Sequence, residues 1–129
     1  MTRFLKWAAA FGVAALSAAP ALAGPASPVG SWEVISGEAR YRVTTCGDSG
    51  ELCAKLIWLR DDKRTEKNLA VLNKYIVRGA EQTDGNQWQG NVVFDGKAYD
   101  GTMTLRSTNS MTLKGCSGIL CQTYQLARI

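Results

Sequence analysis

Gly30-Ser31-Trp32 stands at the start of the first strand-like run, and Arg128 stands one residue from the C-terminus. A large aromatic residue beside a glycine at one end, with a cation at the other, predicts a sheet whose first and last strands meet. An antiparallel barrel removes its exposed edges in this way. We expect Trp32 to lie inside this barrel and the Arg128 guanidinium to stack over its ring from below.

The residues that precede this stretch are typical of a cleavable export signal. Arg3 and Lys6 form a positive start, an apolar run follows, and Ala21-Leu22-Ala23 has the small-x-small form that signal peptidases cleave. The apolar run ends near Leu16, short of the ~20 residues that a membrane span needs. Cleavage of residues 1–23 therefore predicts a mature protein of residues 24–129, located in the periplasm and without a membrane span.

The mature chain has 106 residues (129 − 23), a length that suits one domain. Its formal charge is +2, because removing two of the 15 basic residues leaves 13 against 11 acidic ones. Much of the alkaline character thus belongs to the signal. A weakly charged domain with interspersed signs argues against nucleic acid as a partner, and we expect a monomer.

Four cysteines in an exported chain predict disulfides. Cys46 and Cys53 enclose one turn-rich insert, and Cys116 and Cys121 enclose another. Of the three ways to pair four cysteines, we therefore expect the two local ones. A zinc site ligated by all four is the alternative, but the C-x-x-C spacing of such sites is absent.

Eight strand-like runs separated by turn residues follow one another along the mature chain, with no repeat and no linker to a second domain. Only residues 61–73 interrupt them, and there Thr65 as a cap, with Leu69 and Leu72 three apart, favours a short helix. The expected fold is all-β, a small eight-stranded antiparallel up-and-down barrel. We place the runs near residues 31–36, 39–46, 53–60, 74–82, 87–94, 97–106, 109–116 and 120–128.

Turn residues and the expected disulfides predict how the strands pair. A turn at Gly37-Glu38 sets Trp32 opposite Val43, and counting back from the first disulfide sets Tyr41 opposite Trp58. Each register sorts the large apolar side chains onto one face, whereas a slip by one residue would scramble them.

The two later hairpins follow the same reasoning. A turn at Asp95-Gly96 sets Val92 opposite Tyr99, and the second disulfide sets Leu113 opposite Tyr124. The side chains predicted to face inward are those of Trp32, Val34, Tyr41, Val43, Leu56, Trp58, Tyr75, Val77, Trp88, Val92, Phe94, Tyr99, Met103, Leu105, Met111, Leu113, Tyr124 and Leu126.

Short motifs along nearly the whole mature chain resemble a known family. They are Gly30-Ser31-Trp32, Thr45-Cys46-Gly47, Leu52-Cys53, Lys55-Leu56-Ile57-Trp58-Leu59, Trp88-x-Gly90, Asp95-Gly96-Lys97-x-Tyr99, Leu113-x-Gly115-Cys116 and Cys121-x-Thr123 through Arg128. In this order they are similar to an exported bacterial family known as domain of unknown function number two-one-four-seven. The Trp32 and Arg128 pair also resembles the lipocalin and calycin signature, although the Thr-Asp-Tyr motif of lipocalins is missing. The resemblance implies a periplasmic calycin-like barrel and implies no activity.

No histidine occurs in the chain, which excludes Ser-His and Cys-His nucleophile pairs and histidine-ligated metals. Glu81 has inward parity and offers one carboxylate in apolar surroundings, without a second acid on the same face. The acidic loop of Asp61, Asp62, Glu66 and Asn68 lacks the alternating oxygens and the glycine of a calcium site. We therefore expect no enzyme activity, no metal and no cofactor.

Three glycines, Gly79, Gly90 and Gly101, fall side by side on the inward face if Asp84-Gly85 and Asp95-Gly96 are turns. They either relieve crowding where strands coil to close a barrel or leave a gap in the interior that holds a guest. The second interpretation predicts binding of a small apolar or amphipathic molecule. Its candidate binding residues are Tyr75, Gly79, Glu81, Trp88, Gly90, Tyr99, Gly101, Met103 and Gln122.

An alternative function uses the outside of the barrel. Arg40, Arg42, Ile57 and Leu59 are expected to share an exposed face, and apolar residues beside basic ones can dock a protein partner such as an inhibitor target or an envelope-stress protein. A mixed surface with cross-strand ion pairs, which contribute little to stability, is the competing interpretation.

Overall fold

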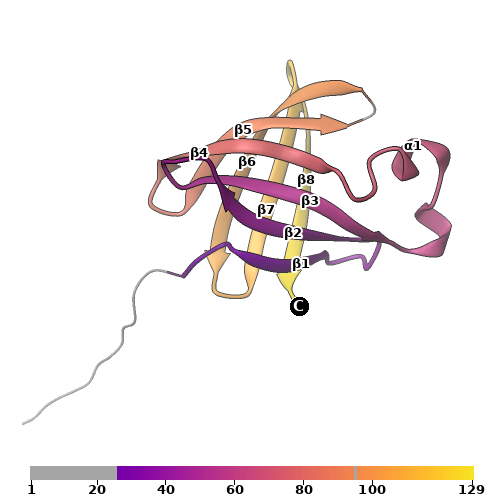
Figure 1. Ribbon diagram of the computed structural model, residues 1–129, viewed down its shortest axis with the longest axis horizontal. Helices are drawn as coiled ribbons and strands as arrows, with labels where there is room; N and C mark the ends of the chain where they lie inside the picture. Colours follow the sequence, from indigo (N-terminus) through magenta and orange to yellow (C-terminus); the bar gives the residue numbers. More distant parts are fainter. Residues whose placement is uncertain (1–25, 95) are drawn as a thin grey trace, which may run out of the picture.

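Eight antiparallel strands follow one another up and down the chain (Figure 1). The computed structural model describes residues 26–94 and 96–129; the expected signal sequence, Asp95 of the expected turn and the side chain of Phe94 lie outside what is described. The strands are β1 (Gly30–Val34), β2 (Ala39–Cys46), β3 (Glu51–Leu59), β4 (Tyr75–Asp84), β5 (Gln87–Phe94), β6 (Lys97–Ser107), β7 (Ser110–Ser117) and β8 (Leu120–Arg128).

The sheet closes on itself, because each strand pairs with the next one along the chain and β8 returns to pair with β1. At this seam Trp32 lies opposite Arg128 and Val34 lies opposite Leu126. The predicted antiparallel barrel, with its first and last strands in contact, is confirmed.

Both expected disulfides are present, Cys46–Cys53 between β2 and β3 and Cys116–Cys121 between β7 and β8. Cys116 and Cys121 lie directly opposite each other. Cys46, however, lies opposite Glu51, two residues before its disulfide partner. The predicted pairing is therefore confirmed, whereas the register counted back from the first disulfide is wrong.

The later hairpins pair as predicted, with Val92 opposite Tyr99 and Leu113 opposite Tyr124. The first hairpin is shifted by two residues, and Trp32 lies opposite Tyr41. The cause is the connection, since residues 35–38 join β1 to β2 where a two-residue turn was expected. A shift of two residues keeps every side chain on its predicted face, so the interior is unaffected.

Trp58 points away from the interior, contrary to the prediction. A register shift between Arg40 and Tyr41 places Tyr41 opposite Leu56 but Arg40 opposite Trp58. Leu56 and Leu59 are buried, and the two residues between them are less so. A β-bulge adds one residue to a strand and reverses the facing of those that follow, which also turns Leu59 inward from its expected outer position.

The strand β4 departs most from simple alternation. Its register shifts against both neighbouring strands, and Gly79 adopts a φ of 66°. Ile76 and Val77 are consecutive and both buried, whereas Tyr75, Gly79 and Glu81 are exposed. The inward positions predicted for these last three residues are therefore wrong.

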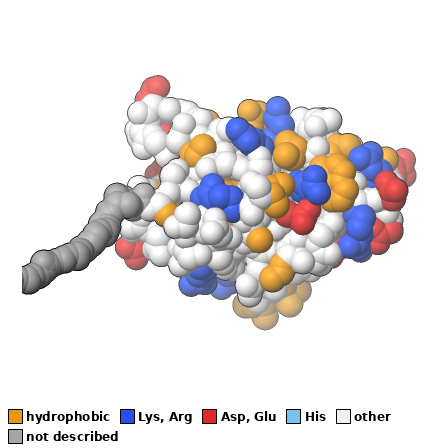
Figure 2. Space-filling model, turned by 90° about the horizontal axis from the view of Figure 1, so that it is seen from below, with side chains coloured by type: hydrophobic (Ala, Val, Ile, Leu, Met, Phe, Trp, Pro, Cys, Tyr) orange, Lys and Arg blue, Asp and Glu red, His pale blue; other side chains and the backbone are white. Residues whose placement is uncertain are grey.

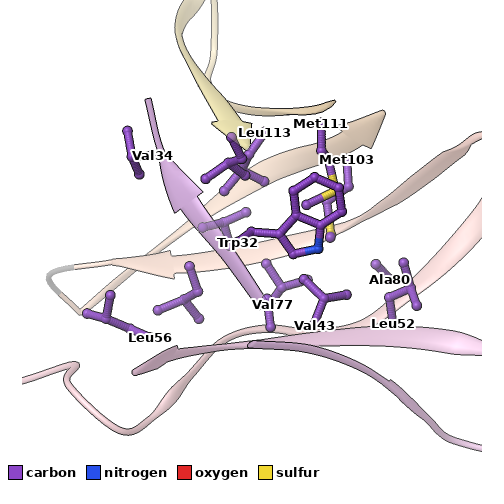
Figure 3. Packing of buried hydrophobic residues seen from close by; sticks show 14 of the residues in the cluster. Trp32, Val34, Val43, Leu52, Leu56, Val77, Ala80, Met103, Met111 and Leu113 are labelled. Atoms are coloured by element: carbon purple, nitrogen blue, oxygen red, sulfur yellow. The ribbon is translucent and has the colours of Figure 1, made fainter. Parts of the chain in front are cut away.

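The hydrophobic core surrounds Trp32, whose fully buried ring lies beside Met103 and Met111 (Figure 3). The Trp32 indole N–H donates a hydrogen bond of 2.8 Å to the Pro28 carbonyl, so its polar group is satisfied despite burial. Every strand contributes to this core. Its other buried members are Val34, Ala39, Val43, Leu52, Ala54, Leu56, Leu59, Ile76, Val77, Ala80, Trp88, Val92, Met103, Leu105, Met111, Leu113 and Leu126.

The segment between β3 and β4 contains a 3-10 turn at Asp61–Lys63 and the short helix α1 (Glu66–Leu69). The Thr65 hydroxyl accepts the Asn68 N–H at 3.3 Å, so the predicted helix and its cap are confirmed. This segment projects from one end of the barrel (Figure 1). Across the described part of the chain, no helix is both long enough and apolar enough to cross a membrane.

Candidate functional site

The two ends of the barrel differ, and we name them by what fills them. The closed end carries Trp32, Arg128 and the connections between β2 and β3, β4 and β5, and β6 and β7. The open end carries residues 35–38, 60–74 and 118–119 together with the turn between β5 and β6.

Arg128 covers the closed end. Its guanidinium carbon lies 4.4 Å from the centroid of the Trp32 ring, so the predicted stacking is confirmed. A Cβ on Gly30 would lie 2.5 Å from the guanidinium, and the φ of Gly30 is 145°, so glycine is needed at this position. The guanidinium also donates hydrogen bonds of 2.6–2.8 Å to three backbone carbonyls, those of Ser27, Val29 and Thr108.

A cavity of about 610 Å³ opens at the other end. Its apolar wall comes from Val34, Ala39, Leu56, Leu59, Ile76, Val92, Leu113 and Leu120, and three tyrosines, Tyr41, Tyr99 and Tyr124, are set among them. Its polar groups belong to Glu38, Lys63, Asn68, Lys97, Ser117 and Gln122. The space is therefore amphipathic, with apolar walls and charged side chains among its lining residues.

Of the three tyrosines, Tyr41 is the one that also borders the small internal void of about 10 Å³. Burial, followed by the proximity of Tyr124 and Glu38, raises the pKa of Tyr41 to about 12. Its hydroxyl makes no hydrogen bond within residues 26–94 and 96–129, whereas the Tyr124 hydroxyl donates to Gln122 Oε1 at 2.9 Å. Tyr41 therefore lines the cavity as a neutral side chain at ordinary pH.

Two charged side chains that line the cavity, Glu38 and Lys63, form an ion pair at the open end. Glu38 accepts a hydrogen bond of 2.6 Å from the Ser36 hydroxyl and lies 3.3 Å from Lys63 Nζ. These contacts, the Ser36 bond first, lower the pKa of Glu38. The Glu38–Lys63 pair connects the loop after β1 to the segment that carries α1, and it links two parts of the cavity rim.

Two of the predicted binding residues line this cavity, Tyr99 on β6 and Gln122 on β8. Three others lie elsewhere, since Tyr75, Gly79 and Glu81 are exposed. Tyr75 faces outward, with Lys55 Nζ 5.0 Å from its ring centroid. The irregular pairing of β4 explains the error, because parity counted from one end of a bulged strand fails beyond the bulge.

The remaining predicted residues belong to the packed interior. Trp88 is buried opposite Met103, and Met103 borders a void of only about 10 Å³ rather than the cavity. A Cβ on Gly90 would overlap Ala80, and one on Gly101 would overlap Val92. These two glycines therefore mark close packing, and the gap inferred from them is not present there.

Sequence reasoning missed Gly115, the glycine that does border the cavity. It lies directly opposite Gly101, and a Cβ built on it meets no atom within 4 Å. The sequence could have indicated this position, because Gly115 lies two residues after Leu113 and therefore on the same face of β7, which was predicted to point inward.

The outer face of β2, β3 and β4 is basic and aromatic. Arg40 lies 4.4 Å above the Trp58 ring and pairs with Glu33 at 2.7 Å. Arg42 and Lys55 lie directly opposite each other, an unfavourable placement for two cations. Figure 2 shows basic and apolar side chains next to one another across the middle of the face seen from the β1 side, with acidic groups mostly toward its ends.

Together, one packed end closed by a Trp–Arg pair and one open end with an amphipathic cavity define a lipocalin-like barrel. Residues 30–128 match the family described as uncharacterized protein conserved in bacteria (DUF2147), and the chain belongs to this family. The fold is similar to that of protein HP1028 from the human pathogen Helicobacter pylori, which is described as belonging to the lipocalin family. The two share 12% identity and a TM-score of 0.61, over 81% of this chain and 84% of that one. No curated protein matches the chain.

Proposed function

We propose that this protein binds one small apolar or amphipathic molecule in the cavity at its open end. The observation that carries the proposal is the cavity itself. A volume of about 610 Å³ lies within the range of roughly 300–1,000 Å³ that small-molecule sites occupy. Lipocalin-like architecture agrees with this function, since small barrels of this kind hold one small ligand.

The lining residues suggest how such a guest lies. Its apolar part contacts Leu56, Ile76 and Leu113 in the depth of the cavity, and the Tyr41 hydroxyl hydrogen-bonds a polar group. A charged or polar end reaches the rim, where Lys97 and Gln122 are among the lining residues.

Binding, rather than catalysis, is the activity we assign to the cavity. The two oppositely charged side chains Glu38 and Lys63 at the rim form an ion pair with each other, so each is already engaged by a partner. Tyr41 keeps its proton far above neutral pH, so it serves as a hydrogen-bonding group and is poorly matched to general-base work near pH 7. The two disulfides and an export-type N-terminal sequence support a periplasmic site of action.

Native mass spectrometry of protein isolated from exporting cells, without a denaturing step, tests this proposal. We expect a co-purifying mass in the wild type that is absent in Gly115→Trp, because the new ring enters the cavity. Ala98→Trp is the matched control, since Ala98 is exposed on β6, and it is expected to retain the mass. A guest kept equally by both variants would contradict the proposed site.

A second candidate function, docking of an acidic protein partner, has one specific observation in its favour. The cations Arg42 and Lys55 lie directly opposite each other on the outer face, where Lys55 also lies over the Tyr75 ring, and an acidic group bound between the two cations would relieve their repulsion. Binding of a polyglutamate peptide that is lost in Lys55→Glu and kept in Lys114→Glu would support it. Equal binding by both variants would refute it.

A further inference from the structure

Among the described residues, no strand lies along one side of about half of β8. The Ile35 N–H donates to the Gln125 carbonyl at 2.9 Å, and beyond this bond residues 35–38 turn away to β2. The strand β8 nevertheless continues over Leu120–Tyr124, which we call the free edge. Figure 1 shows yellow β8 reaching the top of the molecule while β1 stays near the bottom.

Backbone groups of the free edge point to the side without a strand. Gln125 and Ile129 bond toward β1, whereas the Arg128 N–H bonds toward the connection between β6 and β7. Odd-numbered residues of β8 therefore direct their N–H and C=O groups away from β7. By this alternation the backbone N–H and C=O groups of Cys121 and Thr123 point away from β7. Neither residue has a backbone hydrogen-bond partner on that side within residues 26–94 and 96–129.

The free edge lacks the features that keep edges from pairing. Natural edges carry lysine, proline, bulges or covering loops. Residues 117–127 include no charged residue and no proline, and β8 pairs with β7 without an irregularity. At the tip Ile119 is 97% exposed and Leu120 is 75% exposed. An uncharged edge with exposed apolar side chains is suited to receive a further strand.

We propose that the free edge pairs with the same edge of a second copy of this chain, antiparallel about a two-fold axis that passes beside Gln122. This register sets Cys121 opposite Thr123 of the second copy, and the reverse, so the outward backbone groups bond one another. It also sets Leu120 opposite Tyr124 of the second copy, and in the single chain these residues are 75% and 47% exposed.

Two features of the edge favour a second copy over other strands. The register is self-complementary, as an isologous two-fold contact requires. The edge is neutral, so two chains that each carry a net positive charge do not oppose like charges there.

Pairing also completes the wall of the cavity. Leu120, Gln122 and Tyr124 line it, and opposed residues of an antiparallel pair lie on the same face of the sheet. The same three residues of the second copy therefore extend the wall into the gap that the short β1 leaves. The sequence analysis expected a monomer; it could not reveal this edge, because the pattern of side chains does not show where β1 ends.

Sedimentation velocity over a range of concentrations tests the pairing. We expect a reversible monomer–dimer equilibrium for the wild type. Gln122→Lys and Gln122→Glu are each expected to weaken it about fivefold or more, because Gln122 faces itself across the axis. An equimolar mixture of the two variants restores association. The matched controls Ala98→Lys and Ala98→Glu, on the outer face, associate like the wild type.

Thr123→Pro provides a second test that spares the β7–β8 ladder, because the lost N–H points away from β7. We expect a monomer with an unchanged far-ultraviolet circular dichroism spectrum. A wild type that stays monomeric at every concentration would overturn the proposal, as would association that ignores the Gln122 changes. A wild type that stays monomeric but binds an unrelated extended peptide would show that a foreign strand occupies the edge and would also overturn the proposal.

Discussion

The two ends of the barrel are built from the same strands and differ in what fills them. At the closed end Trp32 is fully buried and Arg128 covers its ring. At the open end Tyr41, Tyr99 and Tyr124 stand around a space of about 610 Å³. The Trp32 ring fills the interior beside β1, whereas the cavity lies toward the end at which β1 stops, at Val34.

A pair of glycines shows the same difference at close range. Gly101 on β6 and Gly115 on β7 lie directly opposite each other. A Cβ on Gly101 would overlap Val92, whereas one on Gly115 meets no atom within 4 Å. The missing side chain is required for packing at one position and leaves room at the other, so glycine alone does not tell a crowded site from an open one.

Replacing an aromatic residue at each end gives the largest expected contrast. Trp32→Ala should lower the free energy of unfolding by about 3–5 kcal/mol, because it removes a fully buried ring and leaves the Arg128 guanidinium without its stacking partner. Tyr99→Ala at the open end should cost only about 1–2 kcal/mol. Urea denaturation measures both, and equal losses would contradict the division into a packed and an open end.

Alkaline pH should reveal the buried position of Tyr41. Its pKa rises from an ordinary value of 10.0 to about 12 in the fold, mainly through burial. The unfolded chain therefore loses this proton first, and stability that is fully present below pH 10 is lost as the pH rises toward 12. Relative to Tyr41→Phe, the wild type should lose roughly 2–3 kcal/mol over this interval. Parallel curves for the two proteins would place the Tyr41 hydroxyl in water instead.

The opposed glycines are expected to respond to alanine with opposite signs. Gly101→Ala should destabilise the protein by about 1–3 kcal/mol, because its methyl group overlaps Val92. Gly115→Ala should leave stability unchanged or raise it by about 0.5–1 kcal/mol, since glycine within a strand is itself unfavourable. Thermal unfolding followed by circular dichroism measures both variants. A stable Gly101→Ala protein would mean that the interior near β6 is also open.

The smallest effect is expected at the rim. Glu38→Gln should lower stability by less than about 1 kcal/mol, because the Glu38–Lys63 pair is solvent-exposed. The fold lowers the pKa of Glu38, so the contribution is present above the ordinary value of 4.5 and is lost as the pH falls through the lowered one. Denaturation at pH 7 and pH 3 measures it, and a larger loss at pH 7 would show that the rim helps to hold the barrel together.

The barrel, both disulfides and the Trp32–Arg128 stacking were predictable from the sequence, because parity, cysteine spacing and the ends of the chain report them directly. Bulges were not. The shift between Arg40 and Tyr41 turns Trp58 outward and Leu59 inward, and the irregular course of β4 moves Tyr75 and Glu81 to the surface. The alternation of apolar and polar residues in the sequence does not show where a bulge inserts an extra residue.

The position of the cavity was predictable only in part. Tyr99 and Gln122 line it as expected, because their hairpins are regular. The three glycines pointed to the wrong part of the interior, since Ala80 and Val92 occupy the space beside Gly90 and Gly101. The position of the remaining space depends on the length of β1. The connection at residues 35–38 determines where β1 ends, and the pattern of side chains does not show it.

A fluorescence titration with 1-anilinonaphthalene-8-sulfonate tests the open cavity most directly, because this probe reports accessible apolar surface. We predict one saturable site in the wild type, a loss of affinity of at least about tenfold in Gly115→Trp, where the new ring occupies the space that the probe needs, and wild-type affinity in Ala98→Trp, which adds the same ring outside. Equal binding by the two tryptophan variants, or no saturable binding by the wild type, would contradict the assignment of the open end as a ligand site.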